Sequence, residues 1–165
     1  MCNRTETENQ KCVVKEIPKI TSKKFKCKFD KFIPESLWDQ VEFISTPELK
    51  CVLDEKGKIC GFQWSKIMIW MSDTIGPSAR QEWMDFFRQY QKGRYFIEGV
   101  ANTDDDSKKM TITVDYIDDF GEVASEIIIQ NCTPLSIKLP DADKDGAFHN
   151  EIRVELQPEC AILNF

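Results

Sequence analysis

The spacing of apolar residues changes once along this chain, and that change constrains its fold most. In runs such as 25–29 and 152–156, apolar residues alternate with polar ones. Between residues 77 and 92 they recur instead at helical spacing, in the stripe Ala79, Trp83, Phe86, Phe87 and Tyr90. A period of two indicates strands, and a spacing of three to four residues indicates a helix. The sequence therefore predicts strands on both sides of one amphipathic helix.

The ends of this helix carry residues suited to helix termini. Pro77 suits the first turn, which does not use its N–H, and Ser78 with Gln81 can form a capping box. Gly93 suits the position just beyond the helix, where φ is positive. We therefore expect one flanking helix at about 77–92.

Short runs with β-type patterns fill most of the remaining chain. Gly57 and Gly121 each stand three residues after an aspartate, in tight turns expected to join two strands. Consecutive apolar residues in the run 66–71 predict a strand covered on both faces. The expected strands are 25–29, 41–44, 50–53, 58–62, 66–71, 95–97, 111–117, 124–129, 135–139, 152–156 and 160–162. Strands this close together pair antiparallel, so the predicted fold is mainly β (α+β), a small antiparallel β-barrel or sandwich.

The length and the distribution of polar residues predict a simple domain organisation. The chain has 165 residues, a size suited to one core. Residues 1–22 are mostly polar and are expected to form an N-terminal arm, and residues 23–165 a single domain. The sequence has no run of about 18 apolar residues, the length that a membrane span would need. The seven cysteines lack metal-ligand spacing, which indicates reduced thiols in a protein made in the cytoplasm.

The charge balance argues against a groove that grips nucleic acid. The formal net charge is −6, whereas phosphate binding needs clustered lysine and arginine. The one basic cluster includes Lys24, Lys26 and Lys28, which alternate with apolar residues. Lysines at that spacing are expected to form the solvated face of a strand.

No motif in the chain predicts catalysis or a cofactor. Residues 141–146 match the start of an EF-hand calcium loop, but the twelfth position is Ile152 where a carboxylate is required. The flanks alternate like strands, so 141–151 is expected to be an acidic loop between strands, with weak calcium binding left open. His149 is the only histidine and lies in that loop without a nucleophile motif. We expect no enzyme activity, no metal and no cofactor.

Three features of the sequence appear in an order that carries a family resemblance. A strand begins at Trp64, ends in Ser72 and Asp73, and leads into a helix that opens with the sequence 78–80. A later strand spans 126–134, where three isoleucines follow Glu126 and the pattern ends at Pro134. An acidic loop then ends in the sequence Asn-Glu-Ile at 150–152, before the last alternating strand. In this order, the chain resembles the tail-tube proteins of contractile-tailed bacteriophages, which are related to the tube protein of type VI secretion systems. The resemblance covers roughly residues 25–163.

The resemblance implies a structural protein that assembles with itself. Homo-hexameric rings of a small β-barrel would stack into a hollow tail tube, through which phage DNA passes without specific binding. The expected partners are the tail sheath and the baseplate or terminator proteins. The expected location is the virion tail, assembled in the bacterial host cytoplasm. The cysteines and the polar arm depart from the family pattern and leave open a tube-initiator or terminator ring.

Two groups of residues are candidate contacts between subunits. The hairpin turn Asp54, Glu55, Lys56, Gly57 and Lys58 is the candidate for ring-to-ring contact, together with the N-terminal arm. The helix stripe can pack on the protein's own core, or part of it can contact the next subunit; its candidate residues are Trp83, Phe86, Phe87 and Tyr90. The alternative to a tube subunit is a monomeric β-barrel that binds a ligand or a partner.

Overall fold

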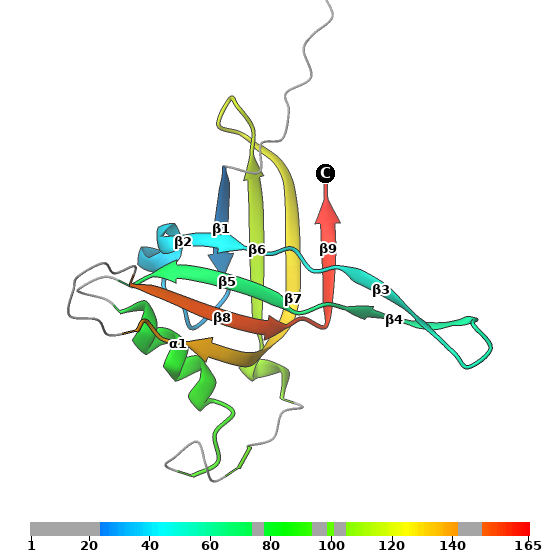
Figure 1. Ribbon diagram of the computed structural model, residues 1–165. Coiled ribbons are helices and arrows are strands. Elements are labelled where there is room, and N and C mark those ends of the chain that lie inside the picture. The colour runs from blue at the N-terminus through cyan, green and yellow to red at the C-terminus, as the bar shows by residue number, and fades with distance from the viewer. Residues whose placement is uncertain (1–23, 74–77, 94–98, 101–104, 142–149) are drawn as a thin grey trace, which may run out of the picture.

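The computed structural model describes residues 24–73, 78–93, 99–100, 105–141 and 150–165. Within these ranges the chain forms nine strands, one α-helix and two short 3-10 helices (Figure 1). In chain order they are β1 (Phe25–Phe29), η1 (Glu35–Gln40), β2 (Val41–Ile44), β3 (Leu49–Leu53), β4 (Ile59–Trp64), β5 (Ile67–Ser72), α1 (Ala79–Arg88), η2 (Asp106–Lys108), β6 (Met110–Ile117), β7 (Val123–Lys138), β8 (Glu151–Gln157) and β9 (Cys160–Asn164). The mainly β prediction with one flanking helix is confirmed.

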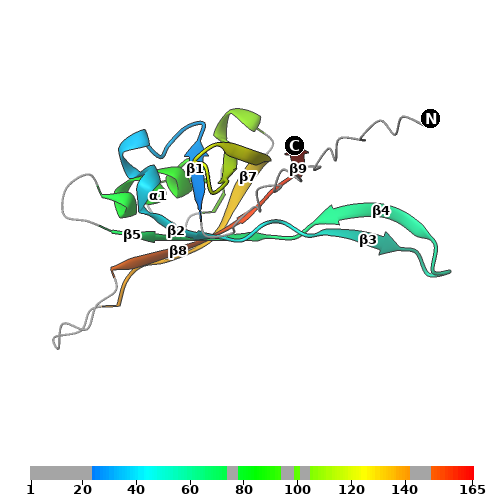
Figure 2. The ribbon, with the colours of Figure 1, turned by 90° about the horizontal axis from the view of Figure 1, so that it is seen from above.

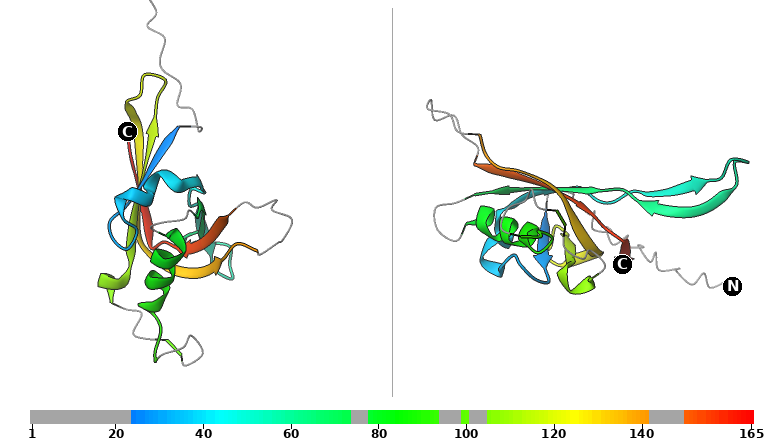
Figure 3. Two further views of the ribbon diagram at one scale, coloured as in Figure 1. Left: turned by 90° about the vertical axis from the view of Figure 1, so that its left-hand side faces the viewer. Right: turned by 90° about the horizontal axis from the view of Figure 1, so that it is seen from below.

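The strands of the body form two sheets that share β7. The first, here called the β1 sheet, contains β1, β6, the first part of β7 and β9. The second, the β5 sheet, contains the end of β7, then β8, β5 and β2. All pairs are antiparallel, and the two sheets cross steeply (Figures 1 and 3). The path ends at β1 and β2, so the described strands form a sandwich and no closed barrel.

A bend in β7 carries the chain from one sheet to the other. The sequence predicts two strands, 124–129 and 135–139, but the structure has one strand of 16 residues. Asn131 lies at the bend with φ of 54°, a conformation that asparagine tolerates better than most residues. The pairing with β8 shifts register just after, between Pro134 and Ser136. Proline cannot donate to a ladder, and it is tolerated here because the ladder is already irregular.

The core lies between the two sheets and under the helix. Seen from above, the β1 sheet, η1 and α1 lie on the same side of the β5 sheet (Figure 2). Trp83 packs edge-on against Phe29, with 5.7 Å between ring centroids, and its indole N–H donates to Met71 Sδ at 3.0 Å. The fully buried residues come from both sheets, η1 and α1; the largest are Trp83, Phe86, Leu37, Ile67, Ile69, Met71, Met110, Ile112, Ile129, Ile152, Leu156 and Val114.

The β5 strand is covered on one face only, which corrects the sequence prediction. Ile67, Ile69 and Met71 are completely buried, whereas Met68 and Trp70 are half-buried on the other face. That outer face has no element packed on it in the part of the chain that is described (Figure 2). Trp70 instead contacts side chains of its own sheet, since Phe43 and the Arg153 guanidinium both lie against its ring. Because these neighbours on the same face shield the Trp70 ring from water, an apolar residue is tolerated at this outward-facing position.

The helix begins and ends inside its predicted range. Ser78 is the N-cap, and its hydroxyl accepts from the Gln81 N–H at 3.4 Å. Only this half of the predicted capping box is formed, because the Gln81 side chain turns to Asp85, to which its amide donates at 2.9 Å, and does not accept from the Ser78 N–H. Gly93 has the expected positive φ, 80°, but it lies four residues beyond the C-cap Gln89 and not directly after the helix as predicted. Pro77 lies outside the described residues.

Asp73 fixes the corner between β5 and α1. Its carboxylate, 7% exposed, forms an ion pair with Arg80 at 2.8 Å and accepts from the Ser78 hydroxyl at 3.2 Å. Its backbone N–H donates to the Asn150 carbonyl at 2.6 Å, at the start of β8. The residues that carry the family resemblance at 72–73, 78–80 and 150–152 therefore meet at one structural corner.

Several predictions concern residues outside the described ranges. These are the arm 1–22, the strand 95–97, and most of the acidic loop, including His149. The flanks of that loop are the strands β7 and β8, as predicted. Lys24, just before β1, and Lys26 within it are exposed as predicted, while Lys28 forms an ion pair with the buried Asp115. None of the described helices is both long enough and apolar enough to cross a bilayer.

Candidate assembly surface

The predicted turn at 54–58 joins β3 and β4 and is held by its aspartate. One oxygen of Asp54, Oδ1, accepts from the N–H groups of Lys56 at 2.9 Å and Lys58 at 2.8 Å. The Gly57 N–H donates to the Asp54 carbonyl at 3.0 Å, and Gly57 has φ of 75°. An aspartate that bonds the backbone two residues on, followed by a left-handed glycine, gives a well-defined turn. The Asp54 and Gly57 pattern in the sequence therefore specifies the shape of the turn.

The two strands of this hairpin present one face without charge. The register pairs Leu49 with Trp64, Cys51 with Phe62 and Leu53 with Ile59, and directly paired residues share a face. We call this surface the hairpin face; its members are Leu49, Cys51, Leu53, Ile59, Phe62 and Trp64. All except Trp64 are exposed, with Phe62 at 66% and Leu53 at 58%.

The hairpin projects from the body instead of packing on it. Figure 2 shows β3 and β4 running outward in the direction of the β5 sheet, away from α1 and the β1 sheet. They pair only with each other. An isolated two-stranded hairpin is marginally stable in water, and it normally needs a third strand or a packed face. An apolar face held out in this way marks an interaction surface.

The helix stripe divides between core and surface. Trp83 and Phe86 are completely buried and in contact with each other, with ring centroids 6.0 Å apart. Phe87 and Tyr90 are only partly buried. Burial raises the pKa of Tyr90 to about 12, which keeps its phenol protonated at neutral pH. Of the four candidate residues in the stripe, only Phe87 and Tyr90 remain available for a contact with another subunit.

Open sheet edges form a second surface; the family resemblance implies edge-to-edge contacts, but the sequence did not identify the strands that provide them. The outer edges of β1 and β9 have no strand partner among the described residues. β1 carries lysines at its edge, and charge of this kind discourages pairing with other chains. β9 has no charged residue, and Ile162 and Leu163 are 43% and 53% exposed. The sequence feature that could have identified this edge is the run 160–165, which has no charged side chain.

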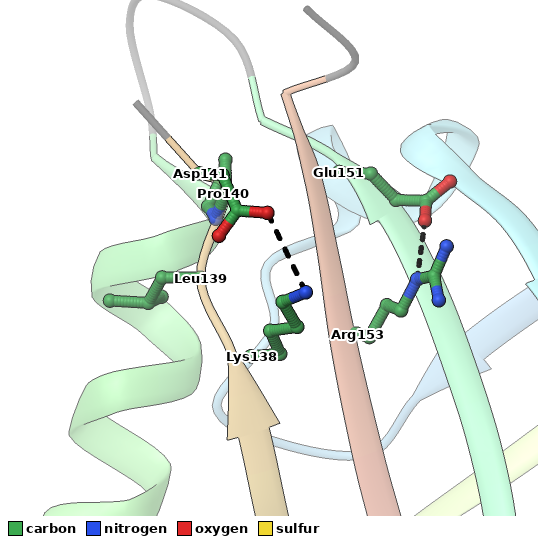
Figure 4. Close-up of a pocket in the computed structure, with 6 residues that line it drawn as sticks. All are labelled: Lys138, Leu139, Pro140, Asp141, Glu151 and Arg153. Atoms are coloured by element: carbon green, nitrogen blue, oxygen red, sulfur yellow. Dashed lines mark hydrogen bonds and ion pairs between the residues drawn. The ribbon is translucent and has the colours of Figure 1, made fainter. Parts of the chain in front are cut away.

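The described pockets are small and lined by charged groups. One, with a volume of about 210 Å³, lies where β7 ends and β8 begins (Figure 4). Its four charges pair off, Lys138 with Asp141 at 3.6 Å and Arg153 with Glu151 at 2.7 Å. Another, of about 200 Å³, lies at the base of the hairpin beside Lys50 and Lys66. Among the described residues, no three histidine, cysteine, aspartate or glutamate side chains gather as a metal site would need.

Of the five cysteines in the described residues, two are buried, two are exposed and Cys160 is half-buried. Burial raises the pKa of the Cys27 thiol to about 12, and the nearby Asp115 carboxylate adds to this. Burial likewise raises the pKa of Cys132 to about 12. Cys51 and Cys60 are exposed on the hairpin, and no disulfide joins any of the described cysteines. The buried thiols are packing groups, whereas of the exposed ones Cys51 lies on the hairpin face.

Comparison with known proteins gives likeness in structure without likeness in sequence. No protein-family model matches the chain, and no curated protein sequence matches it significantly. A chain of the PVC sheath/tube terminator, from an extracellular contractile injection system, is 16% identical with a TM-score of 0.61, covering 92% of this chain and 100% of that one. A chain of the PVC sheath-tube complex is 16% identical with a TM-score of 0.55, covering 96% and 99%.

A third solved structure belongs to a different secretion apparatus. Hcp1 from Flavobacterium johnsoniae is 11% identical with a TM-score of 0.53, covering 85% of this chain and 94% of that one. At sequence identities this low, the structural likeness shows a common fold and nothing more. The likeness spans nearly the full length of these structures. The chain has the fold of the Hcp and tail-tube proteins of contractile injection systems.

Proposed function

We propose that this protein is a structural subunit of the tube in a contractile tail. Homo-hexameric rings would stack into a hollow tube, inside a sheath and between a baseplate and a terminator. In a phage tail this tube delivers DNA, and the subunit would be part of the virion after assembly in the host cytoplasm. Residues 23–165 would form the ring-building domain. The role is structural and needs no catalytic residue.

The projecting hairpin is the observation that carries this proposal. Its face exposes five apolar side chains, and no described part of the protein covers them. A monomer gains nothing from such a face, whereas an assembly buries it. The proposal also draws on the fold, because solved chains with this fold come from a sheath-tube complex and a sheath/tube terminator.

The charge of the chain suits a conduit for DNA. Each copy carries a formal net charge of −6, so a ring accumulates negative charge. An acidic wall repels phosphate groups, and DNA can slide past it without being held. A basic lumen would instead retain the DNA through counterion release.

The turn 54–58 is the proposed ring-to-ring contact. It stands at the far end of the hairpin and is exposed throughout (Figure 2). The arm 1–22 is proposed as a second contact between rings. Deleting residues 54–58 is expected to leave the monomer folded, because no core residue lies in the hairpin, and to abolish stacking.

Electron microscopy and native mass spectrometry test the proposal together. Concentrated protein is expected to show rings or tubes with a central lumen, and native spectra are expected to show a hexamer. The 54–58 deletion should give single rings at most. Tubes of normal length from the deletion variant would refute the role of the turn, and a strictly monomeric species at every concentration would refute the tube function.

A specialised ring is the second candidate. It is supported by the likeness to the PVC sheath/tube terminator, whose TM-score of 0.61 exceeds the 0.55 of the sheath-tube complex chain. A terminator or initiator would form one ring and would not extend into a tube. Single rings at all concentrations, binding to the end of preformed tubes, would favour it over the bulk tube subunit.

A further inference from the structure

The inner face of the β1 sheet, which carries the core, becomes exposed toward one end of the sheet. Leu163 pairs with Ile127, and Ile127 pairs with the fully buried Val114, so these three residues share that face. Along β9 the exposed fraction then rises, from 53% at Leu163 to 95% at Phe165. We call this surface the end patch; its members, from this row and the next, are Phe25, Tyr116, Leu163 and Phe165. No described element covers the end patch at β9, so apolar side chains are left in water there.

The N-terminal arm joins the body at this same end. The Lys24 carbonyl accepts from the Ile117 N–H at 2.9 Å, one residue beyond the pair of Phe25 with Tyr116. The start of β1, the β6–β7 turn and the C-terminus lie together at this end of the sheet (Figure 1). The arm is therefore attached directly beside the end patch.

The length of the arm is sufficient to cross the end patch. Its valines and isoleucines lie no further than about 12 residues from Phe25; they are Val13, Val14, Ile17 and Ile20. An extended chain of that length spans up to about 40 Å. The end patch runs from β1 over β6 and β7 to β9, about 14 Å at a strand spacing of about 4.8 Å. Even a chain that turns back onto the face therefore reaches Phe165.

The arm and the β6–β7 turn carry opposite charges. Residues 11–23 include four lysines and one glutamate, whereas the turn has Asp118, Asp119 and Glu122 and no basic residue. Asp118 is buried and accepts from two N–H groups of its own turn, while Asp119 and Glu122 are exposed. Lys26 lies on the outer face of the sheet, opposite the end patch. Opposite charges beside an apolar contact set its orientation.

Pro18 makes this contact one of side chains rather than of paired strands. A proline has no N–H to donate to a ladder, so it interrupts any strand that residues 13–20 would add to a sheet. The middle of the end patch belongs to β6 and β7, which already have a strand on each side. The apolar side chains of the arm and of the end patch are therefore the groups that gain from contact.

We infer that the arm of each copy folds back and packs its residues 13–20 on the end patch of the same copy. The tether gives the arm an effective concentration on the order of millimolar, above that of arms from other copies in a micromolar solution. The docking does not depend on the proposed tube. It bears on the tube because an arm packed on its own end patch must be released before it contacts the next ring.

Cross-linking from the native Cys12 tests this docking. Every other cysteine except the two buried ones is replaced by serine, namely Cys2, Cys51, Cys60 and Cys160. A second thiol is placed either on the end patch, as Leu163→Cys, or on the opposite face of the same strand, as Ile162→Cys. The two parent residues are neighbours with similar exposed fractions, 53% and 43%, so the control is matched for access and for distance along the chain.

The yield of links within one copy is the quantity measured. A short bismaleimide joins two thiols by addition and needs no oxidant. Mass spectrometry of a mixture of isotope-labelled and unlabelled protein distinguishes links within one copy from links between copies. We expect Cys12 to link to Leu163→Cys with a yield about tenfold higher than to Ile162→Cys. Phe165→Cys, at a position 95% exposed, is a second thiol on the end patch that does not disturb the core.

The arm itself supplies a second matched pair of variants. Ile17→Asp with Ile20→Asp puts charge on the apolar segment and is expected to bring the two yields to the same value. Thr5→Asp with Thr7→Asp adds the same charge to the polar part of the arm and is expected to keep the preference. A preference that survives in the Ile17→Asp, Ile20→Asp variant would overturn the inference.

The outcomes separate the docking from the tube function. Equal yields at Leu163→Cys and Ile162→Cys would overturn the docking, because an undocked arm reaches both faces. A preference found only in links between labelled and unlabelled copies would also overturn it, and would assign the end patch to the arm of a second copy. Tubes in the microscope together with equal yields would leave the tube function standing. A clear preference within single copies of a protein that forms neither rings nor tubes would support the docking and overturn the tube function.

Discussion

The β3–β4 and β6–β7 hairpins turn with the same chemistry but differ in what surrounds their strands. In each, an aspartate Oδ1 accepts two backbone N–H groups, two and four residues further on. In each, the glycine three residues after that aspartate has positive φ, 75° for Gly57 and 83° for Gly121. The β6 strand then buries Ile112 and Val114 completely, whereas β3 leaves Leu49 and Leu53 exposed.

This difference shows that turn chemistry specifies a hairpin but not its burial. Both turns close their strands through local hydrogen bonds, independently of the rest of the protein. β6 is then flanked by β1 and β7, while β3 and β4 have only each other. Apolar residues in β6 therefore stabilise the fold, and apolar residues in β3 and β4 remain available for assembly. Each of the following experiments tests this separation.

The largest contrast is expected from removing one apolar side chain in each hairpin. Ile112→Ala should lower the free energy of unfolding by about 2–5 kcal/mol, since it leaves a cavity in a packed core. Phe62→Ala should change it by less than about 0.5 kcal/mol, because the side chain is mostly in water. Urea denaturation at a concentration where the protein is monomeric measures both. Equal losses would show that the hairpin face packs on the body.

Thiol labelling gives the next contrast without any mutation. At pH 8 a thiol with a pKa near 12 is only about 0.01% thiolate, and burial also blocks reagent access to Cys132. Cys51 is exposed and should react with iodoacetamide on the order of a thousand times faster. Mass spectrometry of peptides after a short pulse measures the ratio. Cys132 should become reactive only on unfolding, and assembly should protect Cys51 alone.

The two turn aspartates give a smaller contrast. Asp118 is buried, and Asp118→Ala removes two hydrogen bonds, from the Phe120 N–H at 2.9 Å and the Glu122 N–H at 3.0 Å. We expect a loss of about 1–2 kcal/mol in the free energy of unfolding. Asp54→Ala should leave that free energy almost unchanged and only speed hydrogen exchange at Lys56 and Lys58, because the exposed turn opens locally. A global loss in Asp54→Ala would mean that the hairpin unfolds with the core.

Local signals in the sequence predicted the elements, and tertiary surroundings decided their exposure. The Asp-x-x-Gly patterns and the aromatic stripe were sufficient for both hairpins and for α1, because each depends on neighbouring residues. The bend of β7 depends on one left-handed residue, Asn131, which carries no periodic signal. The hairpin face has the composition of a buried strand, so only the absence of a covering element in three dimensions reveals it as a surface.

The smallest contrast is expected from acid. Hydrogen bonds from Lys109, and then from Asn131 at the bend of β7, lower the pKa of Glu159, which lies between β8 and β9. A carboxyl with a lowered folded-state pKa stabilises the fold above its unfolded pKa, near 4.5, and this contribution disappears as the pH falls through the folded-state value. Glu159→Gln should therefore flatten the fall in melting temperature below about pH 5. Glu48→Gln, at an exposed ion pair with Lys50 on the hairpin, should not. An equal effect of both substitutions would show that acid acts through general charge, and that the body and the hairpin do not differ in this respect.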